Sequence, residues 1–278
     1  MKSRRAWART WEGAAGIAAA FVIFILPFIF IFLMAMKSKQ EAALMSFSLP
    51  ANFLFWENLM EVVKARDYML LTAYVNSIII TVGSVTLLVI FGAMVGFVLQ
   101  RRRSRWNSVI YGFVLAGLMI PPAVVPTIWV LQQIGLFKTV SGMILIQVAY
   151  GLSFSVLLYR AFFASIPREL DEAAIIEGAN PWQVFFKVIF PLLRPVTITN
   201  VLVQSVGIFN DFTNPLYYLP GKQNVTVQLT LYNFQSQFQS QFNLLFMNIL
   251  LITIPPLVIF IFFNRQIVAG MTAGGVKG

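Results

Sequence analysis

The sequence predicts an all-α integral membrane protein that crosses the bilayer with six helices. Hydrophobic residues make up 59% of the 278 positions and charged residues only 11%, whereas soluble domains carry about 25% charged residues. The apolar residues also gather into runs of the length, about 20 residues, that a transmembrane helix needs. Lysines and arginines concentrate between particular pairs of these runs. We therefore expect one transmembrane domain over residues 1–278.

Six apolar runs qualify as spans. The first is too long for a signal peptide, and Lys37 and Lys39 follow it in place of a small-residue cleavage site, so we expect it to be retained. The predicted spans cover about Gly13–Met36, Ala73–Leu99, Ser108–Ile134, Val140–Phe163, Val188–Phe212 and Leu244–Phe263.

Two longer connections are expected on the outer side of the membrane. They are Ser38–Thr72, which is polar and amphipathic, and Thr213–Gln241, which is rich in Gln, Asn and aromatic residues. Within the second, Asn224–Leu231 alternates as a strand does. Each connection either meets a soluble partner or covers helix ends, and the sequence leaves both interpretations open.

Lysine and arginine counts orient the spans, because cytoplasmic loops carry an excess of these residues. Fourteen of the 20 lie on the side that holds the N-terminal segment 1–12, the connections after the second and fourth spans, and the C-terminal tail 264–278. Both termini are therefore predicted to be cytoplasmic. The net charge of +10 is interpreted as this topology signal and not as a nucleic-acid surface, and the run Arg101–Arg103 as a solvated cytoplasmic loop.

The composition argues against an enzyme. Cysteine and histidine are both absent, which excludes thiolate metal sites and removes the commonest metal ligand and proton shuttle. No GxxxxGK[ST] loop is present to hold nucleotide phosphates. We expect no catalytic residue, no metal and no cofactor bound by this chain. Any nucleotide hydrolysis that drives it must come from a partner.

Few ionisable residues fall inside the spans, and this weakens an ion-coupled mechanism. Asp211 stands near the outer end of the fifth span and Arg160 near the inner end of the fourth. Prolines in the spans either kink packed helices or mark a cavity. The polar residues either line a path for a neutral hydroxylated solute or join helices by hydrogen bonds. The candidates for the path are Asn76, Ser77, Gln204, Asn210 and Asp211.

A charged stretch around Glu169–Pro191 interrupts the apolar pattern. Placing its five charged side chains at mid-bilayer would cost about 3 kcal/mol each, so the stretch is predicted to lie in the cytoplasm. Its residues predict a helix, a turn and a second helix. Ser165 suits the first cap and Pro167 the first turn, Gly178 ends that helix, and Asn180 with Pro181 begins the next, which runs into the fifth span.

The first of these helices is expected to present a contact surface. Leu170, Ala173, Ala174 and Glu177 share one face. Its small residues allow another surface to approach closely, and the acidic residues around them favour a basic partner. The alternative is an ordinary amphipathic loop, and the residues alone do not decide between the two.

Three motifs in the correct order resemble a known family. Glu172-Ala173-Ala174, followed by Gly178 and then by Val188-Ile189-Phe190-Pro191, is similar to the EAA motif of ABC importer permeases, in which the end is usually Ile-x-Leu-Pro. Asn210-Asp211-Phe212 with Pro215-Leu216 is similar to the WNDFxxPL segment of carbohydrate permeases, with Phe209 in place of Trp. The last residues, Asn264–Gly278, are similar to that group's QR…GLTAGAVKG tail. The chain resembles the smaller, maltose-type permease subunit.

The resemblance implies a type I ABC importer permease architecture with a cytoplasmic coupling helix in the loop about 164–187. Partners would be a second homologous permease subunit, a dimer of cytoplasmic ATPase subunits that bind ATP and Mg²⁺, and an extracytoplasmic solute-binding protein. The ATPase would contact the coupling region at Glu169, Leu170, Glu172, Ala173, Ala174, Gly178, Ala179 and Pro191. It would contact the tail at Arg265, Gly270, Thr272, Gly274 and Gly275.

The expected function is ATP-driven import of a carbohydrate, most simply a neutral oligosaccharide, across a bacterial or archaeal cytoplasmic membrane. Three alternatives remain at this point. They are a channel or secondary carrier that works alone, an importer of a glycerol phosphate-type solute, and a structural subunit of a larger complex. The last would leave the small-residue helix and the tail unexplained.

Overall fold

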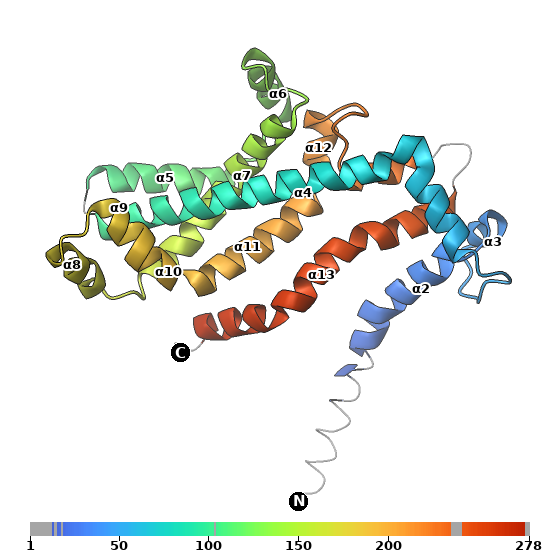
Figure 1. The fold of residues 1–278 in the computed structure, drawn as a ribbon, viewed down its shortest axis with the longest axis horizontal. Helices are drawn as coiled ribbons and strands as arrows, with labels where there is room; N and C mark the ends of the chain where they lie inside the picture. Colours follow the sequence, from blue (N-terminus) through green and yellow to red (C-terminus); the bar gives the residue numbers. More distant parts are fainter. Residues whose placement is uncertain (1–12, 14–15, 18, 103, 235–240, 276–278) are drawn as a thin grey trace, which may run out of the picture. The chain divides into compact units, whose positions relative to one another are not determined.

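Every regular element in the described part of the computed structural model is helical (Figure 1). The structure describes the backbone of residues 13, 16–17, 19–102, 104–234 and 241–275, and side chains as far as Phe263. Across these residues no strand occurs, which confirms the all-α class. The stretch Asn224–Leu231 does not form the strand that its alternation suggests, and Val225, Thr226 and Val227 are all buried, so the alternation does not mark a buried and an exposed face. It leads instead into a short 3-10 helix, η3 (Gln228–Asn233).

The chain divides into two compact units. One comprises residues 1–71 and 229–254, and the other residues 72–228 and 255–278. Two long helices, α4 (Phe55–Arg101) and α13 (Phe242–Gly275), contribute to both units. That the whole chain acts as one transmembrane domain stays a prediction.

The first unit is held by an asparagine that joins three elements. Besides parts of α4 and α13 it contains η1 (Phe21–Ile25), α2 (Leu26–Ala35) and α3 (Lys39–Ala43). The side-chain amide of Asn58, on α4, donates to the carbonyls of Ala35 at 2.8 Å and Lys37 at 3.0 Å. Its oxygen accepts a bond of 2.9 Å from Asn243 on α13. These bonds satisfy carbonyls at the end of α2, where no further helical turn supplies N–H donors for them.

Helix α4 is broken before the predicted second span begins. Residues Ala65 to Tyr68 leave the helical conformation, and Arg66, Asp67 and Tyr68 have φ values of 50°, 57° and 58°. The predicted outer connection Ser38–Thr72 therefore contains a helix of its own, and the predicted span Ala73–Leu99 forms the long regular part of α4.

The second unit contains most of the regions that carry motifs. Its helices besides α4 and α13 are α5 (Trp106–Met119), α6 (Val124–Gln133), α7 (Val140–Phe163), α8 (Glu169–Ile176), α9 (Pro181–Gln183), the π-helix η2 (Val184–Ile189), α10 (Phe190–Leu192), α11 (Arg194–Phe209) and α12 (Thr213–Tyr218). In Figure 1, α8 and α9 lie near the C-terminal end of α4.

The six predicted spans are confirmed only in part. Among the described helices, three are long and apolar enough to cross a membrane, namely Phe55–Arg101, Val140–Phe163 and Phe242–Phe263, and two bent pairs raise this number to five. The predicted fourth span coincides with α7. The predicted first span is represented by a shorter apolar helix, Phe21–Ala35, and part of it lies outside the described residues.

The predicted third and fifth spans are each a bent pair of helices, with the bends at or near prolines. Helices α5 and α6 meet at 117°, and Pro181–Leu192 meets α11 at 76°. Pro121 and Pro122 separate α5 from α6, and Pro195 stands at the start of α11. Proline lacks the N–H that a continuing helix needs and disfavours helical geometry in the residue before it. The hydrophobic runs gave the extent of these segments but not their bends.

Two glycines bring α4 and α7 close together. A Cβ atom added to Gly92 would lie 2.8 Å from the Cβ of Ser155, and one added to Gly96 would lie 3.0 Å from the Cβ of Tyr159. Glycines four residues apart stand on one helix face, a spacing common where membrane helices pack closely. The spacing is visible in the sequence, but only the structure identifies α7 as the helix that they contact.

We expect Gly92→Val to destabilise the protein by about 1–3 kcal/mol, the usual cost of overpacking a close contact. Gly112→Val on α5 is the matched control, because nothing lies within 4 Å of a Cβ added there. Thermal unfolding of the two purified variants in the same detergent measures the difference. Equal unfolding temperatures for both variants would contradict the close contact.

Candidate functional site

The charged stretch forms the short helix α8, with three acidic residues in its first turn. Carboxylates are favoured there because the helix dipole is positive at that end. The predicted cap was wrong: Arg168 holds the N-cap position without a side-chain cap bond. The hydroxyl of Ser165 donates instead to the carbonyl of Phe162 at 2.7 Å, so this serine finishes α7. Pro167 precedes the cap and does not lie in the first turn.

Gly178 ends α8, as the sequence predicts. Its φ is +86°, and its N–H donates to the carbonyl of Ile175 at 2.9 Å. The N–H of Ala179 donates to the carbonyl of Ala174 at 3.0 Å. These two bonds form the Schellman motif, in which the left-handed position favours glycine. No atom lies within 4 Å of a Cβ added to Gly178, so within this chain the residue is required by its backbone conformation.

The second helix begins as predicted and is anchored by aromatic rings. Asn180 caps α9 through a capping box with Gln183, and proline follows the cap. The chain continues through η2, where the ring of Phe185 packs against Phe97 of α4 at 5.3 Å between centroids. Phe97 also meets Phe163 of α7 at 5.6 Å. The aromatic cluster thus joins the stretch after α8 to two long helices.

A buried ion pair ties α8 directly to the end of α4. The Nε of Arg101 lies 2.7 Å from Oδ2 of Asp171, and their side chains are only 9% and 13% exposed. The interpretation of Arg101–Arg103 as a solvated loop is therefore wrong for Arg101, while Arg102 is exposed and Arg103 lies outside the described residues. This pair could not be predicted from the sequence, because the residues that flank Arg101 and Asp171 do not indicate that the two side chains meet.

Three further hydrogen bonds surround this ion pair. Arg101 donates to the carbonyls of Ile166 at 3.0 Å and Pro167 at 3.3 Å, just before α8. In the opposite direction, Arg168 donates to the carbonyl of Gln100 at 3.2 Å. We call the ion pair and these three bonds the strap. It fixes the beginning of α8 to the last turn of α4 from both sides.

Burial raises the pKa of Asp171, and the opposing influence of Arg101 and then Arg168 does not fully offset it. A raised pKa in the folded protein means that ionised Asp171 lowers the stability of the fold at neutral pH, and that protonation as the pH falls relieves this cost. Arg101 is the largest of the influences that oppose the cost of burying this carboxylate. Buried pairs of this kind are often retained for the geometry that they impose.

The remaining side chains of α8 face outward. Asp171 and Ala174 turn inward and are buried. Ala174 is therefore not part of the exposed contact face that the sequence predicts for it. Ile175 is 61% exposed and Ile176 is 86% exposed. We define the outer face of α8 by six exposed residues, namely Leu170, Glu172, Ala173, Ile175, Ile176 and the adjacent Glu177. Of the other predicted contact residues, Glu169, Gly178 and Pro191 are exposed and Ala179 is half-buried.

Two predicted path residues hold the segment that follows α12. The amide of Asn76 on α4 donates to the carbonyl of Val225 at 3.0 Å. The hydroxyl of Ser77 accepts a bond of 3.0 Å from the N–H of Val227. Both residues are buried. Within this chain they connect α4 to that segment, and their part in a solute path stays a prediction.

The other three path candidates surround the bend between α11 and α12. Oδ2 of Asp211 accepts bonds from Gln147 of α7 at 2.6 Å and from Asn214 at 2.7 Å. Asn210 accepts a bond of 3.1 Å from Gln228. Gln204 donates to the carbonyl of Gly151 and the hydroxyl of Ser155, both at 3.2 Å. The five candidates therefore do not form one cluster, and each has a partner within the chain.

The predicted tail contacts cannot be placed by their side chains. The backbone of α13 continues to Gly275, but the side chains from Asn264 onward lie outside the described residues. The ATPase contacts of this tail therefore stay predictions, at Arg265, Gly270, Thr272, Gly274 and Gly275. No group of three or more carboxylates that could hold a metal ion occurs in the described part.

Comparison with protein families gives a match over most of the chain. Residues 88–273 match the model of the "Binding-protein-dependent transport system inner membrane component" family. The matched region includes α8, the Arg101–Asp171 pair and the bend that carries Asp211.

Several relatives match this chain over most of their own length and have a carbohydrate in their name. The diacetylchitobiose uptake system permease protein NgcG of Streptomyces coelicolor is 31% identical over 91% of this chain and 84% of its own length. The melibiose/raffinose/stachyose import permease protein MelC of Bacillus subtilis is 30% identical over 95% of both chains. The probable starch degradation products transport system permease protein AmyC of Thermoanaerobacterium thermosulfurigenes is 33% identical over 92% of this chain and 93% of its own.

The fold matches that of a solved transporter. The crystal structure of a bacterial ABC transporter involved in the import of the acidic polysaccharide alginate superimposes with a TM-score of 0.80. The match covers 95% of this chain and 98% of that chain at 22% sequence identity. At this identity the comparison supports the fold alone.

Proposed function

The chain belongs to the carbohydrate ABC importer permeases of the binding-protein-dependent transport family, and on this premise we propose that it forms half of a solute path driven by a partner ATPase. A second, homologous permease subunit completes the path. A dimer of cytoplasmic ATPase subunits binds ATP and Mg²⁺ and docks on α8 and the C-terminal tail. An extracytoplasmic binding protein delivers the solute, and an alginate transporter of the same fold solved with its periplasmic protein supports this partner.

The outer face of α8 is the observation that carries the proposal. Two isoleucines, Ile175 and Ile176, are exposed on a helix whose neighbours are acidic, and exposed apolar residues rimmed by polar ones are typical of protein-binding surfaces. The charge of the stretch keeps it out of the bilayer, because each buried charge would cost about 3 kcal/mol. The outer face therefore serves as the coupling surface for the ATPase, with Glu172, Ala173 and Gly178 at the positions of the EAA motif.

The strap and the aromatic cluster supply the route by which movement of α8 reaches the membrane helices. The strap joins the start of α8 to the last turn of α4. The rings of Phe185, Phe97 and Phe163 join the segment after α8 to α4 and α7. Displacement of α8 by the ATPase then moves α4 and α7 with it, because well-packed cores transmit displacement and deform little.

The proposed orientation has both termini in the cytoplasm of a bacterial or archaeal cell. Lys and Arg are concentrated on the side of α8 and of the connection after α4, in agreement with the positive-inside rule. Asn76, Ser77, Asn210 and Asp211 then stand toward the outer side, where solute arrives from the binding protein.

The proposed solute is a neutral oligosaccharide. Relatives are named for diacetylchitobiose, for melibiose, raffinose and stachyose, and for trehalose, all of them uncharged sugars. The candidate path residues offer amides and hydroxyls, which suit sugar hydroxyls, and one carboxylate, Asp211, which disfavours an anion. The alternative is an acidic or phosphorylated solute. A transporter of the same fold is involved in the import of the acidic polysaccharide alginate.

Reconstituted transport tests this proposal. Proteoliposomes that contain the chain, its partner permease and the ATPase are expected to accumulate radiolabelled raffinose or a related neutral oligosaccharide severalfold over a control without ATP, and only with the cognate binding protein. Uptake that proceeds without ATP would indicate a channel or carrier and contradict the proposal. Preferential uptake of an alginate oligomer or of glycerol phosphate would overturn the neutral solute alone.

A further inference from the structure

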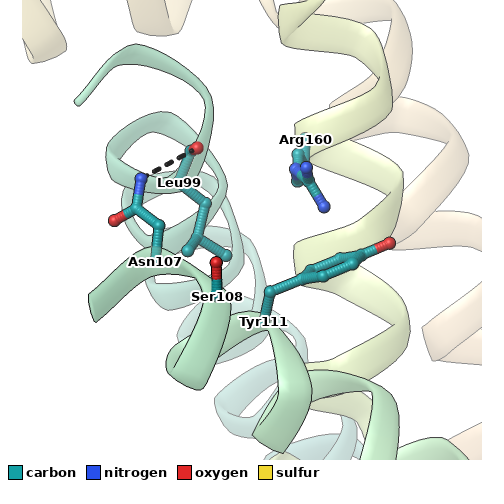
Figure 2. Close-up of a pocket in the computed structure, with 5 residues that line it drawn as sticks. All are labelled: Leu99, Asn107, Ser108, Tyr111 and Arg160. Atoms are coloured by element: carbon teal, nitrogen blue, oxygen red, sulfur yellow. Dashed lines mark hydrogen bonds between the residues drawn. The ribbon is translucent and has the colours of Figure 1, made fainter. Parts of the chain in front are cut away.

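A small cavity opens between the ends of three helices, away from the outer face of α8 and from the candidate path residues. Its volume is about 110 Å³, and it is lined by Leu99, Asn107, Ser108, Tyr111 and Arg160. Figure 2 shows Leu99, Asn107 and Ser108 on one side of it, with Arg160 and Tyr111 on the other. None of the described residues that line the cavity is a carboxylate, and Arg160 gives this lining a positive charge.

Among the described residues, Arg160 has no hydrogen-bond acceptor. Its guanidinium lies over the ring of Tyr111, 3.9 Å from the centroid, and Figure 2 shows the ring extending beneath it. In the part of the chain that the structure describes, this side chain has no hydrogen bond and no ion pair. A guanidinium carries five N–H donors in a planar fork, which matches the oxygens of a phosphate. The stacked ring holds the fork in place without satisfying those donors.

The cavity stands where three helices end. Leu99 belongs to the last turn of α4, Asn107 and Ser108 to the first turn of α5, and Arg160 to the last turn of α7. Asn107 is already committed, because its amide donates to the carbonyls of Arg102 at 2.6 Å and Leu99 at 3.4 Å. Ser108 and Arg160 are thus the polar groups that a ligand would meet.

The surroundings are those of a membrane surface. Trp106, at the start of α5, is exposed, and tryptophan is enriched at the level of lipid headgroups. Arg102 and Arg105 are exposed beside it. The apolar faces of α5 below this level expose Val109, Ile110 and Phe113, which suit acyl chains. A ligand with an anionic head and an apolar tail would therefore satisfy both parts of the surface.

We propose that this cavity binds the phosphate of an anionic phospholipid headgroup, with the guanidinium of Arg160 and the hydroxyl of Ser108 as its donors. Basic pockets between membrane helices on the cytoplasmic side are suited to anionic headgroups. The lipid would bridge the ends of α4, α5 and α7, next to the strap on α4. The proposal is independent of the sugar path and of the ATPase contact.

Native mass spectrometry of the full-length purified chain tests this site. The probes are dioleoyl phosphatidylglycerol and dioleoyl phosphatidylcholine, which share acyl chains and differ in net charge. We expect a preference for phosphatidylglycerol that falls about tenfold in Arg160→Gln, since a charge-assisted bidentate contact is lost. Arg194→Gln is the matched control, because it removes an exposed arginine at the start of α11, outside the cavity and its surroundings, and it is expected to keep the preference.

Arg160→Lys and competition by inorganic phosphate test the same site further. Arg160→Lys retains the charge but not the fork, and is expected to bind phosphatidylglycerol with intermediate affinity. Equal retention of phosphatidylglycerol by the native protein and Arg160→Gln would overturn the site, as would equal binding of the two lipids by the native protein. Displacement of the bound lipid by millimolar inorganic phosphate would assign the cavity to a soluble phosphate and overturn the lipid.

Discussion

Replacing Ala173 with tryptophan is expected to abolish solute uptake while the chain remains in the membrane. Ala173 is exposed on the outer face of α8, and its small side chain allows a docked surface to come close. A bulky ring there would separate the surfaces, and the loss of one central contact in a protein interface costs about 2 kcal/mol or more, roughly thirtyfold in affinity. Uptake in proteoliposomes and co-purification of the ATPase measure the two effects.

A matched control separates docking from folding in this experiment. Ala164→Trp introduces the same ring at an exposed alanine at the end of α7, outside α8, and is expected to retain uptake. Gly178→Asp is expected to share the defect of Ala173→Trp, since it adds a charge beside the outer face and strains a position with φ of +86°. Normal uptake together with normal ATPase retention in Ala173→Trp would refute the coupling surface.

The second large effect is expected at the strap. Arg101→Glu would leave Asp171 facing a like charge in a buried site, and removing one partner of a buried pair costs about 3–5 kcal/mol. The start of α8 would detach from α4, so that the ATPase still docks and hydrolyses ATP but moves the membrane helices less. We expect the amount of sugar imported per ATP hydrolysed to fall more than tenfold, a change of about 1.4 kcal/mol in the coupled step.

Charge exchange distinguishes this role from a general loss of structure. The double variant Arg101→Glu with Asp171→Arg restores an ion pair and is expected to recover part of the import per ATP. Recovery will be incomplete, because the exchanged glutamate cannot donate to the carbonyls of Ile166 and Pro167. Arg102→Glu changes an exposed neighbour and serves as the control. A ratio of sugar to ATP that is unchanged in Arg101→Glu would show that the strap transmits nothing.

The features predicted well from the sequence are those with local causes. The end of α8 at Gly178 and the start of α9 at Asn180 follow from backbone conformation and capping within a few residues. The extent of α7 follows from one apolar run. The cap at Ser165 was wrong because α8 begins only at Glu169, so that Arg168 holds the N-cap position, while the hydroxyl of Ser165 donates to the carbonyl of Phe162 in the last turn of α7.

The sequence by itself determined the class of the molecule, its helical segments and its family, because insertion energy, capping and motif spacing act over short distances. The tertiary structure alone decided that Arg101 reaches Asp171, that Gly92 and Gly96 meet α7 and that Arg160 faces a cavity. These contacts depend on which helix packs beside which. Burying a charged side chain is tolerated only where packing also brings a partner of opposite charge to it. No local pattern encodes such partners, since each lies in a different helix.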